Sequence, residues 1–538
     1  MRRTRVGTAS PGHRRGSMTV AGRIAGAKRR GTEGFFPSIV EIDRESSSKE
    51  GASKINFRAV FLSLKRPSTE DINLGIWLSC GVALGWLLAW WFAASHVILA
   101  NDTWWQIVAG KDILSGHWPV HNTWSWTLPR ERWMVQEPLF DVLEAWASKR
   151  GYWGLSLLPA AFMAAGMGFL WDLLRRRSGD ITALLLGSTA LYLTLGAWEV
   201  RPQVADYLGL IVVLWAIGRG RFWVIPFSTV VWANLHSGAV ISPLIMSVFL
   251  AVDLVPGCWL DRVRLEASGQ WRKMVAPTAA AYLATLATHN GIGIWVYSVR
   301  TLFDSPTFAK YIQEWMPPDF GDPLTRAMFI AILLLLIFPL VLRKNIKLSA
   351  AELVLFVGFL FQSLGENRFI PYLYLLTIVM ISPLWSWRVT TSVITKAIFF
   401  LALLTSFLYA ISRHFGVPSP DMEIQAALEG YPVSAVSYIK DHHLGPVYNH
   451  YNWGGYLIYE GIPVYIDGRS EVYYWAKEDI FAQYINVQRL VDVDQGLKGA
   501  NVVLDYKDSI LVKYLLVSKQ WKVLGSDRWG VVLGKVKE

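Results

Sequence analysis

The sequence predicts a mainly α protein: a polytopic bundle of about eleven transmembrane helices followed by a soluble C-terminal α/β domain. Hydrophobic residues make up 53% of the 538 residues and charged residues only 17%, whereas a soluble domain usually carries about 25% charged residues. The 27 tryptophans suit membrane–water interfaces, where the indole ring is apolar and its N–H reaches water. Mean hydropathy is +0.31. Lipid is therefore the expected solvent for much of the chain.

Apolar runs mark the predicted spans, which lie within residues 73–412. They cover 75–100, 152–174, 181–198, 204–217, 222–235, 239–255, 275–292, 327–342, 351–364, 369–387 and 397–411. Several are shorter than the roughly 20 residues that a perpendicular helix needs. Short spans suit helices whose ends are buried in protein or line a cavity.

Basic residues determine the predicted orientation, because Lys and Arg collect in short cytoplasmic connections. Residues 1–72 form a basic tail that is expected to be disordered and cytoplasmic. Every second connection after it is also basic, for example 175–177, 219–221 and 343–347. An odd number of spans then places the C-terminal domain, residues 416–538, outside the membrane. This distribution accounts for the net charge of +11 without a nucleic-acid partner.

Two predicted outer loops, residues 101–151 and 291–323, are much longer than the basic connections. In the first, Asp102 is placed to cap a helix with apolar residues at helical spacing. A second helix is predicted to begin at Pro138, with apolar residues on one face and acidic residues on the other. Both patterns are typical of helices that lie in the interface plane.

The C-terminal domain is predicted from alternating helical and extended patterns. Helices are expected at 433–439, 455–459, 480–490 and 509–517, and strands at 447–451, 464–467, 502–506, 521–524 and 530–533. The alternation favours a small α/β domain with a mostly parallel sheet.

Ionisable and amide residues gather at the predicted outer ends of the spans. The orientation of the spans is inferred from the basic loops alone, so this clustering is an independent observation. They are Asp102, Glu137, Glu199, Arg201, Asn234, His236, His289, Asn290, Glu314, Glu366 and Arg368. Such residues are costly near a membrane and need a reason to be there. Their placement predicts an outward-facing polar cavity.

The residue types in this set fit a lipid substrate that bears a phosphate. Arginine binds phosphate oxygens through two parallel hydrogen bonds, and a carboxylate can act as general base toward an acceptor hydroxyl. The predicted catalytic residues are Asp102, Glu137, His236 and Glu314. The predicted substrate-binding residues are Arg201, Arg368, Asn234, Trp104 and Trp105, the tryptophans stacking on sugar rings.

Each of these residues also has a structural interpretation. Asp102 would only cap a helix, and His236 would be a hydrogen-bonded residue at a helix end. The arginines would pair with near neighbours, Arg201 with Glu199 and Arg368 with Glu366. The tryptophans would anchor the loop among lipid headgroups. No metal-ligand residues are predicted, because Pro119 interrupts the spacing between His117 and His121.

A series of short motifs resembles a group of bacterial membrane proteins related to GT-C fold glycosyltransferases. In order, the motifs occupy residues 102–110, 118–127, 136–139, 201–203, 232–238, 313–315, 317–320, 367–371, 452–457 and 465–469. The resemblance implies a polyprenyl-phosphate-linked sugar donor used at the outer face of the bacterial cytoplasmic membrane. It also implies that an acid directly after the first span, here Asp102, is catalytic or assists a divalent metal ion. Relatives often have a second acid beside it, whereas here the neighbours are Asn101 and Thr103.

The sequence therefore supports two functions of different kinds. The first is a glycosyltransferase that joins a sugar from this donor to a lipid, glycan or protein acceptor among the membrane lipids. The second is a non-catalytic scaffold or carrier of lipid-linked glycans, whose C-terminal domain binds a partner. A transporter is disfavoured, because the chain has no repeated halves.

Overall fold

The computed structural model of the chain describes residues 100–255, 259–260, 263–266, 268–310, 312–342, 346–385 and 421–536. These residues are mostly helical, as the sequence predicts, with two small sheets. The predicted tail at 1–72, nearly all of the first predicted span and the last one at 397–411 lie outside the described residues.

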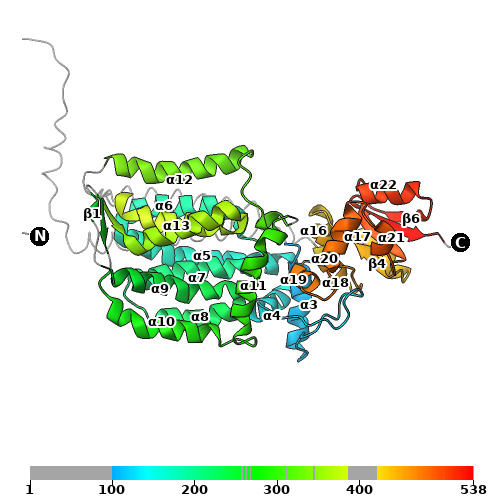
Figure 1. Cartoon of the computed structure of the whole chain (residues 1–538), viewed down its shortest axis with the longest axis horizontal. Coiled ribbons are helices and arrows are strands. Elements are labelled where there is room, and N and C mark those ends of the chain that lie inside the picture. The colour runs from blue at the N-terminus through cyan, green and yellow to red at the C-terminus, as the bar shows by residue number, and fades with distance from the viewer. Residues whose placement is uncertain are drawn as a thin grey trace, which may run out of the picture. The chain divides into compact units, whose positions relative to one another are not determined.

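Apolar helices that lie alongside one another form a bundle (Figure 1). They are α5 (Gly151–Ser178), α6 (Asp180–Thr194), α7 (Gln203–Gly218), α8 (Val224–Leu235), α9 (Ile241–Asp253), α10 (Trp271–Thr285), α12 (Pro323–Leu342), α13 (Ala350–Gly365) and α14 (Ile370–Ile381). Within the described residues, 3 helices are long and apolar enough to cross a membrane, and further apolar helices are shorter. The count of about eleven spans therefore stays a prediction.

The exterior of this bundle is apolar, as expected for a membrane protein. On α12, Leu334 and Val341 are exposed, and the helix is long and apolar enough to cross a membrane. A surface of this kind requires lipid rather than water around it. The helices end where the sequence supplies turn residues: Gly179 has a φ of 88° directly after α5, and Gly220 has a φ of 64° between α7 and α8.

Two helices of the 101–151 loop pack against each other, α3 (Thr103–Leu114) and α4 (Pro138–Ser148). Helix α4 begins at the predicted proline, in the first helical position that proline favours. A Cβ atom at Gly110 of α3 would overlap the carbonyl of Asp141, so only glycine permits this close packing.

The two faces of α4 have the predicted chemistry. Trp146 on the apolar face is 61% exposed, whereas Asp141 and Glu144 on the acidic face are 0% exposed. Burial and the neighbouring carboxylates raise the pKa of both acids well above its usual value. The shift favours the protonated form of these two side chains, which is less costly to bury than the charged form.

The chain from residue 421 onward contains short helices around a sheet. The helices are α16 (Met422–Leu428), α17 (Val433–Asp441), α18 (Gly454–Tyr459), α19 (Ser470–Tyr474), α20 (Ile480–Gln488), α21 (Val493–Gly496) and α22 (Ile510–Val517). The strands are β4 (Val447–Asn449), β5 (Val502–Tyr506), β6 (Trp521–Ser526) and β7 (Gly530–Lys535), in the order β4-β5-β7-β6.

The prediction of a mostly parallel sheet is wrong. Only β4 and β5 are parallel, and the pairs β5–β7 and β6–β7 are antiparallel. The reason is the short connection between β6 and β7, where Asp527 accepts hydrogen bonds from the backbone N–H groups of Trp529 and Gly530. A turn this tight can only join antiparallel strands.

The predicted strand at 464–467 lies outside the sheet. Val464 instead pairs with Ser125 of the 101–151 loop in an isolated bridge. A single hydrophobic core also joins that loop to the C-terminal segment, since Trp104 and Ile107 belong to the same cluster of buried residues as Ile466 and Val503. The C-terminal segment is therefore packed on the loop rather than suspended from a linker.

A second, smaller sheet consists of β1 (Trp259–Leu260), β2 (Val263–Glu266) and β3 (Ile346–Ser349). Strands β1 and β2 are antiparallel, and β2 and β3 are parallel. It joins two of the basic connections that the sequence predicts to be cytoplasmic.

The orientation can be tested with single cysteines in a chain whose Cys80 and Cys258 are replaced by serine. Ser518 is exposed at the end of α22, and Arg221 is exposed in a basic connection. We expect an impermeant maleimide to label Ser518→Cys in intact spheroplasts and Arg221→Cys only after lysis, because the sequence predicts that the basic connections face the cytoplasm. The reverse pattern would contradict the predicted orientation.

Candidate active site

A polar chamber of about 100 Å³ lies where the bundle, the two long loops and the C-terminal segment meet. Most of the residues that the sequence predicts to be functional line it, namely Asp102, Trp105, Glu137, Arg201, His236, Glu314 and Arg368. They come from segments far apart in the sequence, and the fold brings them together around one polar space, as the sequence predicts. Their roles in binding or catalysis remain predictions.

Arg201 is the centre of the chamber's charge network. Its Nη2 donates to Asp102 Oδ2 at 2.8 Å, and its Nη1 donates to Glu314 Oε2 at 2.6 Å. The near neighbour Glu199 therefore is not its direct partner. Pro202 follows Arg201 and caps α7, and a residue before proline is kept out of the helical conformation. The arginine is thereby placed at the mouth of the bundle.

The two carboxylates on Arg201 differ in their acidity. Burial raises the pKa of Asp102, although Arg201 opposes the shift. For Glu314, burial alone would raise the pKa, but Arg201 and Arg368 together outweigh it and the pKa is lowered. Glu314 is therefore firmly ionised, whereas Asp102 takes up a proton more readily.

Asp102 occupies the N-cap position of α3, but its side chain makes no capping hydrogen bond. Its second oxygen, Oδ1, accepts a hydrogen bond of 3.1 Å from the indole of Trp105. A Cβ atom at Gly468 would overlap the same oxygen. Contacts within the chamber, and not helix capping, thus hold this carboxylate in place.

Arg368 carries a positive charge into the chamber. Its guanidinium lies 4.0 Å from the ring centroid of Trp315. Glu366, the neighbour expected to pair with it, instead accepts a hydrogen bond of 2.6 Å from Ser305. Within the part of the chain that the structure describes, Arg368 forms no ion pair, so its donors are available to a ligand.

His236 is oriented by an acid that sequence reasoning missed. Its Nδ1 lies 2.7 Å from Asp206 Oδ2, which also accepts a hydrogen bond from Tyr372. The other oxygen of Asp206 accepts one from Trp232. The remaining ring nitrogen, Nε2, is therefore the one available at the cavity wall. The signal that could have revealed Asp206 is its position as the single acid in the apolar run 204–217, because an acid inside a membrane helix usually has a function.

Two predicted binding residues lie outside the lining of the chamber. Trp104 is 0% exposed and packs edge to face against Tyr431, Tyr456 and Tyr459. Asn234 donates hydrogen bonds to the carbonyls of Val230 and Ala287. The contacts of Trp104 and Asn234 are thus with the protein itself, and neither side chain faces the chamber. Glu137, by contrast, faces the chamber and accepts a hydrogen bond from Gln106.

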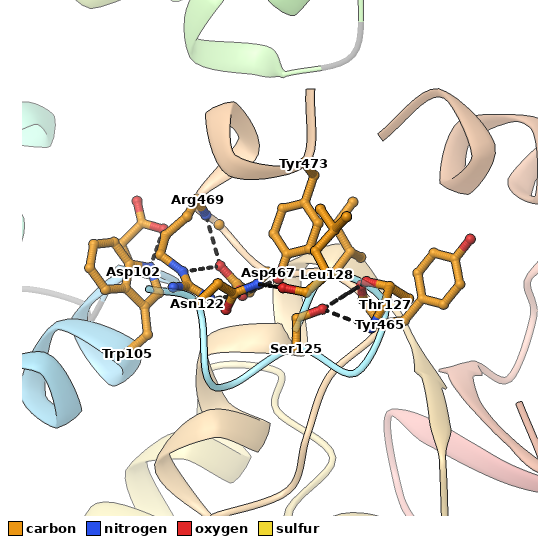
Figure 2. Close-up of polar contacts among 12 residues, drawn as sticks. Asp102, Trp105, Asn122, Ser125, Thr127, Leu128, Tyr465, Asp467, Arg469 and Tyr473 are labelled. Carbon is orange, nitrogen blue, oxygen red and sulfur yellow. Dashed lines mark hydrogen bonds and ion pairs between the residues drawn. The ribbon is translucent and has the colours of Figure 1, made fainter. Parts of the chain in front are cut away.

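A buried arginine from the 465–469 motif closes the chamber on the C-terminal side. Arg469 is 1% exposed and binds both oxygens of Asp467, at 2.8 and 2.6 Å. Its Nη2 also donates a hydrogen bond of 3.0 Å to Asn122 of the 101–151 loop (Figure 2). Its guanidinium lies 4.6 Å from the ring centroids of both Trp124 and Trp133.

The chamber residues do not fit a divalent metal ion. Such an ion needs several oxygen ligands around one point. Asp102 and Glu314 both bind Arg201, so the positive charge between these two carboxylates is a guanidinium and leaves no place for a metal ion. Among the described residues, no group of three His, Cys, Asp or Glu side chains is arranged to hold a metal.

An apolar cavity of about 510 Å³ adjoins the polar chamber. Its walls are formed largely by aliphatic and aromatic side chains of α9, α11 (Gly293–Phe308), α13 and α14. Both spaces are lined by His236, Ser237, Tyr297, Thr301, Trp315 and Arg368. The free guanidinium of Arg368 therefore stands at the boundary between an apolar space and a polar one.

Comparisons with known proteins give distant structural likenesses. The sequence matches no protein-family model. It is similar to no curated protein. Among solved structures, ArnT from Cupriavidus metallidurans bound to undecaprenyl phosphate has 15% identity and a TM-score of 0.47, covering 86% of this chain and 98% of its own.

Two further solved structures are similar to a comparable degree. The archaeal oligosaccharyltransferase AglB from Archaeoglobus fulgidus, in complex with an inhibitory peptide and a dolichol-phosphate, has 13% identity and a TM-score of 0.44, covering 82% of this chain and 70% of its own. The arabinofuranosyltransferase AftD from Mycobacteria has 16% identity and a TM-score of 0.46, covering 86% and 40%. Values this low do not define an activity for this chain.

The Arg469 network predicts a measurable loss of stability in one variant. Arg469→Lys keeps the charge but loses the bidentate pair with Asp467 and the planar contact with two indoles, so we expect it to cost about 2–4 kcal/mol of unfolding free energy. The measurement is thermal melting of the detergent-solubilised protein. Lys440→Gln is the control, because its ion pair with Glu460 is exposed and is worth at most about 1 kcal/mol. Equal melting of the two variants would contradict the prediction.

Proposed function

We propose that this protein is a membrane glycosyltransferase. It would transfer a sugar from a polyprenyl-phosphate-linked donor to an acceptor at the outer face of the bacterial cytoplasmic membrane. The observation that supports this most is the shared wall between the apolar cavity and the polar chamber. That wall contains Arg368, whose guanidinium forms no ion pair with any of the described residues. A lipid phosphate has the same division, an apolar chain joined directly to an anionic head.

The apolar cavity suits the first isoprenoid units of such a donor. Val248, Leu302, Leu355 and Phe359 are among the side chains that line it. An isoprenoid chain that enters this cavity exchanges contacts with lipid tails for contacts with apolar side chains, so it meets no uncompensated polar surface. The chain can continue into the surrounding lipid, since the helices beside the cavity have apolar exteriors.

The phosphate would lie at the boundary and be bound by Arg368 and by His236. Arg368 offers parallel N–H donors, and His236 offers Nε2 when Asp206 holds Nδ1. Arg201 was expected to share this role. Because Asp102 and Glu314 already balance its charge, we assign Arg201 to holding those carboxylates in position.

Asp102 is the proposed proton acceptor. The acceptor hydroxyl oxygen attacks the anomeric carbon of the sugar, and the bond from that carbon to the phosphate oxygen breaks. The lipid phosphate leaves with the electron pair, the hydroxyl proton moves to Asp102, and the sugar inverts its configuration. A raised pKa favours this role, because general-base catalysis works best when the pKa lies near the working pH.

The proposal is tested by incubating the purified chain, in lipid nanodiscs, with radiolabelled polyprenyl-phosphate sugars and membrane extracts that supply acceptors. Transfer of label from the lipid to a second molecule supports the enzyme. Tight binding without any transfer or hydrolysis would instead support the carrier of lipid-linked glycans.

Arg368 should control the affinity for the donor. Arg368→Lys removes the planar fork, and we expect undecaprenyl phosphate to bind about tenfold more weakly or worse. Arg326→Gln is the control, because Arg326 is exposed at the start of α12 and lines none of these cavities. Binding is measured by microscale thermophoresis in nanodiscs. Unchanged affinity in Arg368→Lys would remove this residue from the phosphate site.

Asp102→Asn separates catalysis from structure. Asparagine retains the size of the side chain, and its one amide oxygen can accept the hydrogen bond of Arg201 or that of Trp105 but not both. It cannot take up the proton. We expect normal melting and a loss of transfer of about a hundredfold or more. Asp112→Asn, on the same helix, should retain full activity. Full activity in a normally folded Asp102→Asn variant would exclude Asp102 as the base.

A further inference from the structure

A third space, the loop cavity, opens beside the polar chamber and has a volume of about 740 Å³. Its walls come from the 101–151 loop, from residues 289–300 and from the chain around α19. They include aromatic rings and a larger share of polar surface than the walls of the apolar cavity. This mixed lining does not match the long apolar chain of a lipid.

The aromatic rings of the loop cavity are held in position by the protein. The indole N–H of Trp475 donates to Asp304 at 2.7 Å, and the ring of Tyr297 lies edge to face against Trp475. On another side, the ring of Trp118 lies 4.2 Å from that of His289. Fixed aromatic rings offer flat apolar surfaces at little cost in conformational entropy.

Hydrogen-bonding side chains accompany these rings. His121, Glu131, Arg132, Asn290 and Arg300 all line the cavity. Flat aromatic rings next to amide, guanidinium and carboxylate groups match a sugar, which has an apolar ring face and hydroxyls around its edge.

Glu471 connects the loop cavity to the polar chamber. The described residues that line both spaces are Trp133, Met134, Tyr297 and Glu471, and Glu471 is the one carboxyl group among them. Its Oε1 accepts a hydrogen bond of 3.2 Å from Gln136, whose own oxygen accepts one from Ser237 at the wall of the apolar cavity. The group is thus linked by hydrogen bonds to the place proposed for the donor phosphate.

The surroundings of this carboxyl group favour its protonated form, which can donate a hydrogen bond. Burial raises the pKa of Glu471 to about 8, with Glu137 adding to the shift and Arg469 opposing it. Asp467 also raises it, and the groups facing it from α11 are Tyr297 and Arg300. A protonated carboxyl can donate to a sugar oxygen that has no proton of its own to offer.

We propose that the loop cavity binds the acceptor and that the acceptor is a carbohydrate, with Glu471 contacting the sugar unit that enters the polar chamber. This inference rests on the proposed function, because the acceptor hydroxyl must reach the anomeric carbon of the donor. It assigns the 101–151 loop and the C-terminal segment to acceptor choice, and the bundle to the lipid donor.

The test uses the full chain in nanodiscs with a panel of soluble tetrasaccharides, such as maltotetraose, cellotetraose and chitotetraose, at millimolar concentration. Binding is read by saturation-transfer NMR. We expect at least one tetrasaccharide to bind. Trp475→Ala and Glu471→Met should each weaken that binding about tenfold or more, whereas Glu471→Gln should retain most of it, because glutamine also donates a hydrogen bond. Trp146→Ala, on the exposed face of α4, is the control and should have no effect.

Undecaprenyl phosphate binding, measured on the same samples, separates this inference from the proposed function. Loss of tetrasaccharide binding in Trp475→Ala with normal melting and normal lipid binding supports a separate acceptor site. If no tetrasaccharide binds the parent chain, or if the variants bind as well as the parent, the inference is wrong even when lipid binding is normal. Binding of an unstructured peptide panel in place of the sugars would likewise overturn it. Failure of undecaprenyl phosphate to bind the parent chain would count against the proposed function itself.

Discussion

A partly buried guanidinium is costly unless anions surround it, and Arg201 meets this requirement with two carboxylates from distant parts of the chain. Asp102 comes from the start of α3, and Glu314 comes from the loop that follows α11. Each loop is thereby fixed to the mouth of the helical bundle. Removing Arg201 would leave both carboxylates without their cation, and removing either carboxylate would release one side of the guanidinium, so the three groups form one unit. The polar chamber has its shape because this unit holds two loops and the bundle together.

Glycines allow the C-terminal segment to approach this unit closely. A Cβ atom at Gly455 would overlap the carbonyl of Asn101, and one at Gly454 would overlap the carbonyl of Ile466. Gly468 lies against the carboxylate of Asp102 in the same way. These are the glycines of the 452–457 and 465–469 motifs. Gly468 forms part of the chamber wall, which explains why a segment that begins far from the first loop in sequence contributes to the site.

Features set by local chemistry could be predicted from the sequence. The start of α4 at Pro138 follows from the preference of proline for the first helical turn. The meeting of polar residues at one end of the bundle follows from the cost of placing charge in lipid. Pairings between distant segments could not be predicted. Neighbouring Glu199 was an obvious partner for Arg201, but the choice of Glu314 depends on how the helices pack. The antiparallel β6–β7 pair and the position of Val464 outside the sheet depend on tertiary contacts in the same way.

Among the residues that the structure describes, Tyr297 on α11 is the one that lines the polar chamber, the apolar cavity and the loop cavity. A molecule that moves this ring to enter one space changes the walls of the other two. Occupancy of one space then alters the affinity of the others, and by thermodynamic necessity the effect is reciprocal. A protein built in this way would not bind its substrates independently. Binding of one substrate would change the affinity for the next through a single phenol ring, without any motion of whole domains.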